Sequence, residues 1–178
     1  MSAWPAPRSR HGGADEIPLP EGSGRLWLCG KHFVGPDPEE ALQQTGADLV
    51  VCLCEPSELD QRYPAYVRWL EDNAGARAVW FPVPDLHAPT SDQADRFLDE
   101  LAARLESGAV VLLHCGAGIG RAGTLAAALL MRMGLPLEEA VVQVAAHRPL
   151  AGPEAGAQSQ LLAELASRPR REGLPDAE

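Results

Sequence analysis

The sequence predicts a single compact α/β domain with a central, mostly parallel sheet flanked by helices. The chain has 178 residues, which suits one domain of ordinary size with a sizeable hydrophobic core. Short apolar runs alternate with longer amphipathic segments, as strands and helices do in this class. In addition, a glycine-rich loop stands between an apolar run at 109–113 and an apolar helical stretch at 122–133.

Strands are expected at residues 25–29, 48–53, 78–82 and 109–113. Residues 48–53 and 109–113 are continuous apolar runs, which are typical of strands buried on both faces of a sheet. Pro82 and Pro84 end the strand at 78–82, because a proline cannot donate a hydrogen bond to a sheet ladder.

Helices are expected between these strands and after the last of them. Thr90 or Ser91 can cap a helix that runs through Leu105, and Gln93 stands three residues after Thr90, as a capping box requires. The stretch at 122–133 is apolar on nearly all sides, so we expect a central helix there. The remaining helices are predicted at 38–44, 63–73, 137–146 and 158–167.

Both ends of the chain differ in composition from the middle. Residues 1–24 are rich in proline and glycine and are predicted to be disordered, whereas 25–168 form the domain and 169–178 a flexible tail. Neither a secretory signal nor a membrane span is expected, because no apolar stretch is long enough. The four cysteines do not suggest a disulfide framework, so the prediction is a cytoplasmic protein.

The charge balance limits the classes of partner. Fifteen basic and 25 acidic residues give a formal net charge of -10. This charge argues against nucleic-acid binding and against adsorption to an anionic membrane surface, since both depend on lysine and arginine. An anionic ligand would therefore have to be held by a concentrated local site.

Residues 110–124, with the sequence VVLLHCGAGIGRAGT, contain such a site. The glycines allow the loop to curl so that successive backbone N–H groups point inward and form an anion-binding nest. The helix that follows directs its N-terminal dipole at the same point. We therefore expect Gly116, Ala117, Gly118, Ile119 and Gly120 to surround a phosphate-sized anion.

Cys115 and Arg121 stand at the two ends of this loop. A thiol close to a helix N-terminus and a cation ionises readily, which would make Cys115 a nucleophilic thiolate. The planar guanidinium of Arg121 matches two oxygen atoms of a phosphoryl group. A nucleophile and a bidentate clamp around one anion-binding loop indicate phosphoryl-transfer chemistry.

The segment 114–121, HCGAGIGR, resembles the HCxxGxxR signature of cysteine-dependent protein-tyrosine and dual-specificity phosphatases. The resemblance extends over residues 25–167, and the size is most similar to that of the compact dual-specificity group. It implies hydrolysis of phosphomonoesters, phosphotyrosine and phosphoserine or phosphothreonine in proteins included, through a phosphocysteine intermediate. It also implies that His114 supports the loop backbone, although a buried core histidine would suit that position equally.

The resemblance further implies a general acid, an aspartate on a mobile loop before the cysteine. Asp85 stands on a proline-framed loop directly after the strand at 78–82, and such acids contribute about 10²–10⁴-fold. A plain turn residue is the alternative, because Pro-Asp pairs are common in turns. His87 is next in line as a candidate.

The second step of the implied reaction depends on groups beyond the loop. The family uses a C-terminal glutamine segment to position water, for which Gln158 is the first candidate and Gln160 the second. The family also usually has serine or threonine after the signature arginine, whereas this chain has Ala122 there and Thr124 two positions later. Either Thr124 substitutes or the phosphoenzyme turns over slowly. Arg148 is expected to cap the preceding helix, or to bind a second anion.

Three other interpretations of the loop can be compared with this one. The segment 118–123, GIGRAG, also fits the dinucleotide fingerprint G-x-G-x-x-G, but no second strand ending in an acid follows it. A rhodanese-like sulfurtransferase would not need Arg121 together with a distant Asp85. A non-catalytic phosphate-binding module on the same scaffold remains open because of Ala122, although Cys115 argues against it.

No metal or other cofactor is expected, because Arg121 and the loop N–H groups compensate the phosphate charge. Cys52 and Cys54 are too close in sequence to form a zinc-type pair, so with Cys29 they are interpreted as apolar strand residues. The predicted partner is a phosphoprotein or a small phosphomonoester, with no nucleic acid and no membrane, and the oligomeric state is left open.

Overall fold

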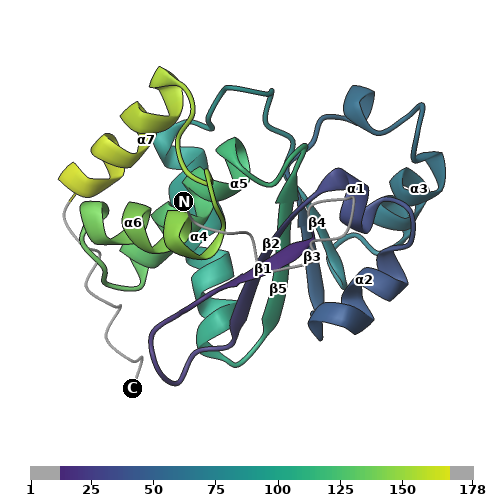
Figure 1. The fold of residues 1–178 in the computed structure, drawn as a ribbon, viewed down its shortest axis with the longest axis horizontal. Coiled ribbons are helices and arrows are strands. Elements are labelled where there is room, and N and C mark those ends of the chain that lie inside the picture. Colours follow the sequence, from purple (N-terminus) through teal and green to yellow (C-terminus); the bar gives the residue numbers. More distant parts are fainter. Residues whose placement is uncertain (1–12, 169–178) are drawn as a thin grey trace, which may run out of the picture.

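The computed structural model describes residues 13–168, which form a five-stranded sheet with helices on both faces (Figure 1). Strand β1 pairs antiparallel with β2, and the other neighbouring strands are parallel. This arrangement confirms the predicted α/β class and the mostly parallel sheet. From one edge to the other the strands are β1 (Ala14–Ile17), β2 (Arg25–Gly30), β5 (Val110–Cys115), β3 (Leu49–Cys52) and β4 (Ala78–Trp80).

The helices divide into two layers, one on each side of the sheet (Figure 1). One layer contains α1 (Lys31–Val34), α2 (Pro38–Thr45) and α3 (Pro64–Asp72), and the other contains α4 (Ser91–Glu106), α5 (Gly120–Arg132), α6 (Leu137–His147) and α7 (Gly156–Ser167). Helix α5 packs against α4, α6 and α7, and its side chains are almost all buried. Its central position follows from a sequence that is apolar on nearly every side.

Each face of the sheet has its own hydrophobic core, because side chains alternate along a strand. On β5, Leu113 and Cys115 belong to the core under α4 to α7, whereas Leu112 belongs to the core under α1 to α3. His114 contacts Tyr66 of α3 and therefore lies on the α1 to α3 side. Two consecutive residues at the end of β5 thus serve opposite faces of the sheet.

The predicted capping box at the start of α4 is confirmed. The Thr90 hydroxyl accepts a hydrogen bond from the Gln93 N–H at 3.2 Å, and the Gln93 side chain accepts one from the Thr90 N–H at 3.1 Å. Two of the N–H groups that a helix start leaves unpaired are satisfied in this way. The α4 helix is therefore fixed directly after the loop that carries Asp85.

The prediction of disorder through residue 24 is wrong for β1. Ile17 is buried in the core, and the Asp15 carboxylate accepts a hydrogen bond from Arg148 at 2.8 Å. One apolar anchor and one buried ion pair order this segment against the edge of β2, and composition alone did not reveal them. The disorder predicted for 1–12 and the flexible tail predicted at 169–178 lie outside the described residues.

Two short elements were also absent from the sequence expectations, namely α1 and the 3₁₀ turn η1 (Pro56–Glu58). Both are about one turn long, so neither produces a repeating hydrophobic pattern. Among the described helices, none is both long enough and apolar enough to cross a membrane.

Candidate active site

The glycine-rich loop lies between the end of β5 and the start of α5, as the sequence predicts. Cys115 is the last residue of the strand and is 3% exposed, and Gly120 is the first residue of the helix. The loop residues between them therefore face the N-terminal end of α5, where unpaired N–H groups and the helix dipole favour an anion.

Three successive carbonyl groups of the loop are hydrogen-bonded from outside it. The Gly116 carbonyl accepts from the Lys31 N–H at 2.9 Å, and the carbonyls of Ala117 and Gly118 accept from the Arg148 guanidinium at 2.9 and 2.7 Å. In a trans peptide the carbonyl and the next N–H point in opposite directions. The N–H groups of residues 117, 118 and 119 are therefore turned toward the inside of the loop.

Gly118 brings the loop close to the neighbouring strand β2. Its φ angle is +73°, a left-handed conformation that side chains rarely adopt. A Cβ atom added there would lie 2.3 Å from the carbonyl oxygen of Cys29. This position therefore requires glycine both for its backbone angle and for the space beside β2.

Arg121 is buried above the loop and is held by Glu58 from η1. Its Nη1 and Nη2 donate to the two carboxylate oxygens of Glu58, at 2.8 Å each, and Nη1 also donates to the carbonyl of Val83 at 2.7 Å. Among the described residues, nothing accepts a hydrogen bond from Nε of Arg121. Nε of Arg121 is thus a buried N–H without a partner in the described part of the chain, on the guanidinium edge that it shares with Nη2.

Electrostatic contacts link Arg121 to the cysteine and to its acidic partner. Burial lowers the pKa of Arg121, but the hydrogen bonds to Glu58 and the attraction of Cys115 outweigh burial and raise it above its ordinary value. Burial also raises the pKa of Glu58, whereas hydrogen bonds from Arg121 and from the Glu55 N–H outweigh that effect and lower it. The site therefore contains a fixed cation beside the cysteine and an ionised carboxylate behind it.

Asp85 lies at the mouth of the site, on the loop between β4 and α4. Its Oδ1 is 3.5 Å from Nη2 of Arg121, and its side chain is 69% exposed. The same oxygen accepts a hydrogen bond from the Leu86 N–H at 3.0 Å, and the His87 ring contacts the Asp85 carbonyl. The structure thus brings Asp85, Arg121 and Cys115 together, although they come from different parts of the chain.

His114 supports the loop from the opposite face of the sheet. Its Nδ1 is 3.1 Å from the Cys115 carbonyl, and its Nε2 is 2.6 Å from the hydroxyl of Tyr66. Because a carbonyl can only accept, Nδ1 carries the proton and Nε2 accepts from Tyr66. The two interpretations of His114, a loop support and a satisfied core histidine, are therefore compatible.

The other supporting candidates do not reach the centre of the loop. The Thr124 hydroxyl donates to the Gly120 carbonyl at 2.6 Å, within its own helix. The buried Gln158 side chain accepts from the Glu154 N–H at 2.8 Å and donates to the His87 carbonyl at 3.3 Å, so it lies against the loop that carries Asp85. Gln160 bonds Glu164 on the exposed face of α7.

Two important residues of the site were not recognised from sequence. Glu58 was not singled out, although a buried arginine requires a carboxylate partner and Glu58 is an acid close after a buried strand. Arg148 is the C-cap residue of α6, as expected, and its N–H donates to the Val144 carbonyl at 2.9 Å. Its buried guanidinium also holds the loop carbonyls and Asp15, and sequence reasoning missed this second role because the contacts come from distant segments.

The other cysteines differ from Cys115 in their surroundings. Burial raises the pKa of the Cys29 thiol, and a hydrogen bond between Cys54 and Cys52, together with burial, raises that of the Cys54 thiol. Both thiols are therefore protonated and weakly nucleophilic at neutral pH. The electrostatic attraction of Cys115 for Arg121 is stronger than that of Cys54.

Residues 29–172 match the sequence model described as "PTP-SAK: Swiss Army Knife protein, DSP-PTPase phosphatase domain". This match covers most of the chain and includes the whole site. The chain belongs to the dual-specificity and protein-tyrosine phosphatase family. Membership of this family excludes the rhodanese-like sulfurtransferase. The dinucleotide-binding alternative is excluded because it needs a second strand after α5, and helix α6 follows α5 instead.

Two curated phosphatases resemble parts of the chain. Human dual specificity protein phosphatase 5 is 36% identical over 85 residues, which are 47% of this chain and 22% of that protein. Mouse protein tyrosine phosphatase type IVA 3 is 31% identical over 104 residues, 57% of this chain and 56% of that protein. The chain therefore spans about a fifth of the first relative and about half of the second.

Solved phosphatase structures resemble nearly the whole chain. Tk-PTP in its active form has a TM-score of 0.66 at 31% identity, covering 83% of this chain and 94% of that one. Kinase associated phosphatase, with serine in place of its catalytic cysteine, has a TM-score of 0.72 at 22% identity, covering 88% and 97%. The second likeness concerns the fold alone, whereas the first also supports membership of the phosphatase family.

Proposed function

We propose that this phosphatase-family domain hydrolyses phosphomonoesters through a phosphocysteine intermediate on Cys115. The observation that carries the proposal is the Nε–Nη2 edge of Arg121. This edge has no partner at Nε, lies beside Cys115 and is fixed by Glu58 behind it. Two phosphoryl oxygens fit such an edge, with the inward N–H groups of the loop holding the others.

In the first step the Cys115 thiolate attacks phosphorus, an S–P bond forms and the P–O bond to the leaving group breaks. Asp85 transfers its proton to the leaving oxygen, for which its exposed position at the mouth of the site is suited. Arg121 and the loop N–H groups stabilise the charge on the three equatorial oxygens. These groups provide the charge compensation, so the proposed step requires no metal ion.

In the second step water attacks phosphorus, the S–P bond breaks and the Cys115 thiolate leaves. Asp85, now a carboxylate, takes a proton from the attacking water, and inorganic phosphate departs. Gln158 lies behind the loop that carries Asp85, so its proposed role in water placement acts through that loop.

The substrate class follows from the charges near the loop. The variable positions Gly116, Ala117, Ile119 and Gly120 contain neither lysine nor arginine, and the chain carries a net charge of -10. This composition favours phosphotyrosine and phosphoserine or phosphothreonine of proteins over highly anionic lipid or nucleic-acid phosphates. The four cysteines are free thiols, which suits a reducing compartment such as the cytoplasm.

Hydrolysis of a chromogenic aryl phosphate tests the proposal directly. The wild-type domain should release the phenol in a vanadate-sensitive reaction, whereas Cys115→Ser should bind the same ester without turnover. Binding without turnover by the wild type would instead indicate the non-catalytic phosphate-binding module. Cys29→Ala is a matched control, since it removes a buried thiol that does not take part in the proposed chemistry.

A further inference from the structure

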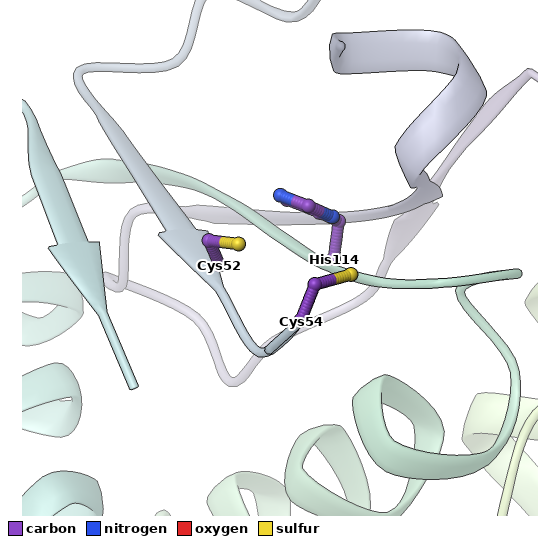
Figure 2. Close-up of side chains that lie close together, drawn as sticks. All are labelled: Cys52, Cys54 and His114. Carbon is purple, nitrogen blue, oxygen red and sulfur yellow. The ribbon is translucent and has the colours of Figure 1, made fainter. Parts of the chain in front are cut away.

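Strands β3 and β5 bring three metal-binding side chains together behind the phosphate loop. Cys52 is paired in register with His114, so their side chains lie side by side on one face of the sheet. Cys54 follows Cys52 by two residues, and its side chain belongs to the same core under α1 to α3. Figure 2 shows the two thiols and the imidazole close together.

The distances between the three ligand atoms are close to those between the ligands of a tetrahedrally coordinated ion. The two sulfur atoms and an imidazole nitrogen all lie within 4.8 Å of one another, and the three residues are completely buried. Zinc bonds of about 2.3 Å to sulfur place two sulfur ligands about 3.8 Å apart. An inward shift of about 1 Å would therefore convert this cluster into a coordination shell.

The hydrogen bonds of His114 show which of its nitrogens could bind a metal. Nδ1 donates its proton to the Cys115 carbonyl at 3.1 Å, so Nε2 carries the lone pair. Metal-bound histidines commonly donate their other N–H to a backbone carbonyl in this way. The hydroxyl of Tyr66 now donates to that lone pair at 2.6 Å, so a metal would replace this hydrogen bond and would have the same hydroxyl oxygen nearby as a fourth donor.

The composition of the cluster selects the kind of ion. Two thiolates and an imidazole are ligands that zinc prefers, whereas calcium and magnesium require oxygen ligands. Within residues 13–168 this is the one place where three cysteine, histidine, aspartate or glutamate ligand atoms converge. The many carboxylates of this acidic chain do not form a comparable group in that part of the chain.

We propose that Cys52, Cys54 and His114 bind one Zn²⁺ ion, with Tyr66 as the neighbouring oxygen donor. Binding converts the two thiols to thiolates and releases their two protons to solvent, while no electron is transferred. The site is distinct from the phosphate loop, because Cys115 faces the opposite core. The sequence spacing of Cys52 and Cys54 did not reveal it, since the third ligand comes from another strand.

Cobalt substitution tests this proposal without any measurement of phosphatase activity. The full chain, reduced and freed of metal, is titrated with Co²⁺ and then with Zn²⁺. One equivalent of Co²⁺ should produce thiolate-to-metal charge-transfer absorption and intense tetrahedral bands, and Zn²⁺ should remove both. Zinc should also raise the thermal midpoint of the wild type, because it binds the folded state.

Variants show which thiols take part. Cys52→Ala and Cys54→Ala should each abolish the charge-transfer band, whereas Cys29→Ala and Cys115→Ser should keep it. Cys29 is the matched control, since it is equally buried and is paired with His114 from the other side. The proposal is wrong if the wild type shows no such band, or if Cys115→Ser loses it while Cys52→Ala keeps it. The wild-type titration decides the question even if a variant fails to fold.

Discussion

Glu58 holds Arg121 by two hydrogen bonds of 2.8 Å, one to each terminal nitrogen of the guanidinium. The pair leaves Nε without a partner among the described residues, and a Cβ atom added at Gly116 of the phosphate loop would lie 3.3 Å from Nη2. A guanidinium on a long side chain would otherwise have several orientations, and a bidentate carboxylate selects one of them. Glu58 thus acts as a positioning residue for the proposed clamp.

Glu58→Gln should lower kcat/KM by about 10- to 100-fold, because a misplacement near 1 Å can cost about 100-fold in rate. The amide keeps one acceptor but loses the charge and the bidentate geometry. Steady-state kinetics on an aryl phosphate measures the effect. Asp60→Asn, an exposed loss of charge two residues away, is the control and should behave as wild type. Equal kinetics of Glu58→Gln and wild type would contradict the positioning role.

The loss of activity in Asp85→Asn should depend on the leaving group of the substrate. With a poor alkoxide leaving group, as in a phosphoserine peptide, loss of the general acid should lower kcat by about 10²–10⁴-fold. With an activated aryl phosphate the loss should be much smaller, since that leaving group departs without a proton. His87→Ala, on the same loop, should show no such dependence. A uniform loss across leaving groups would assign Asp85 a structural role instead.

Gly118 and Gly46 form a matched pair, with φ angles of +73° and +70°. Alanine at either position adopts a left-handed conformation that costs about 1–2 kcal/mol. At Gly46 the new Cβ meets nothing within 4 Å, whereas at Gly118 it would lie 2.3 Å from the Cys29 carbonyl. Thermal denaturation should show a larger loss for Gly118→Ala, and activity should fall about 100-fold in that variant alone.

The Glu39 carboxylate should make folding stability depend on acidic pH. Hydrogen bonds from Arg77 and then from Trp69 lower the pKa of Glu39 from 4.5 to about 2. The stabilisation is complete above pH 4.5 and is lost as the pH falls toward 2, because the unfolded chain binds a proton first. The thermal midpoint of wild type should exceed that of Glu39→Gln by a small margin at pH 7 and not at pH 2. Because the pair is exposed, added salt should reduce that margin.

The sequence was sufficient to predict what depends on local pattern. Apolar runs, the Thr90–Gln93 capping box and the strand–loop–helix around Cys115 are encoded by neighbouring residues. Glu58 and the Asp15–Arg148 pair could not be predicted in this way, because each depends on a contact between distant segments. Such ion pairs depend on the order of the strands in the sheet, and the pattern of apolar residues does not determine that order.

The residue after Arg121 should decide how fast the phosphoenzyme is hydrolysed. Ala122 carries no hydroxyl, and the Thr124 hydroxyl is occupied by the Gly120 carbonyl at 2.6 Å. A departing thiolate therefore lacks a hydroxyl donor, so we expect a burst of product near one equivalent per enzyme, then slow turnover. Rapid-quench kinetics measures this burst. Ala122→Ser should reduce the burst and raise the steady-state rate, whereas Thr124→Val should slow the second step no further. Linear kinetics from the first turnover of the wild type would exclude slow hydrolysis of the phosphoenzyme.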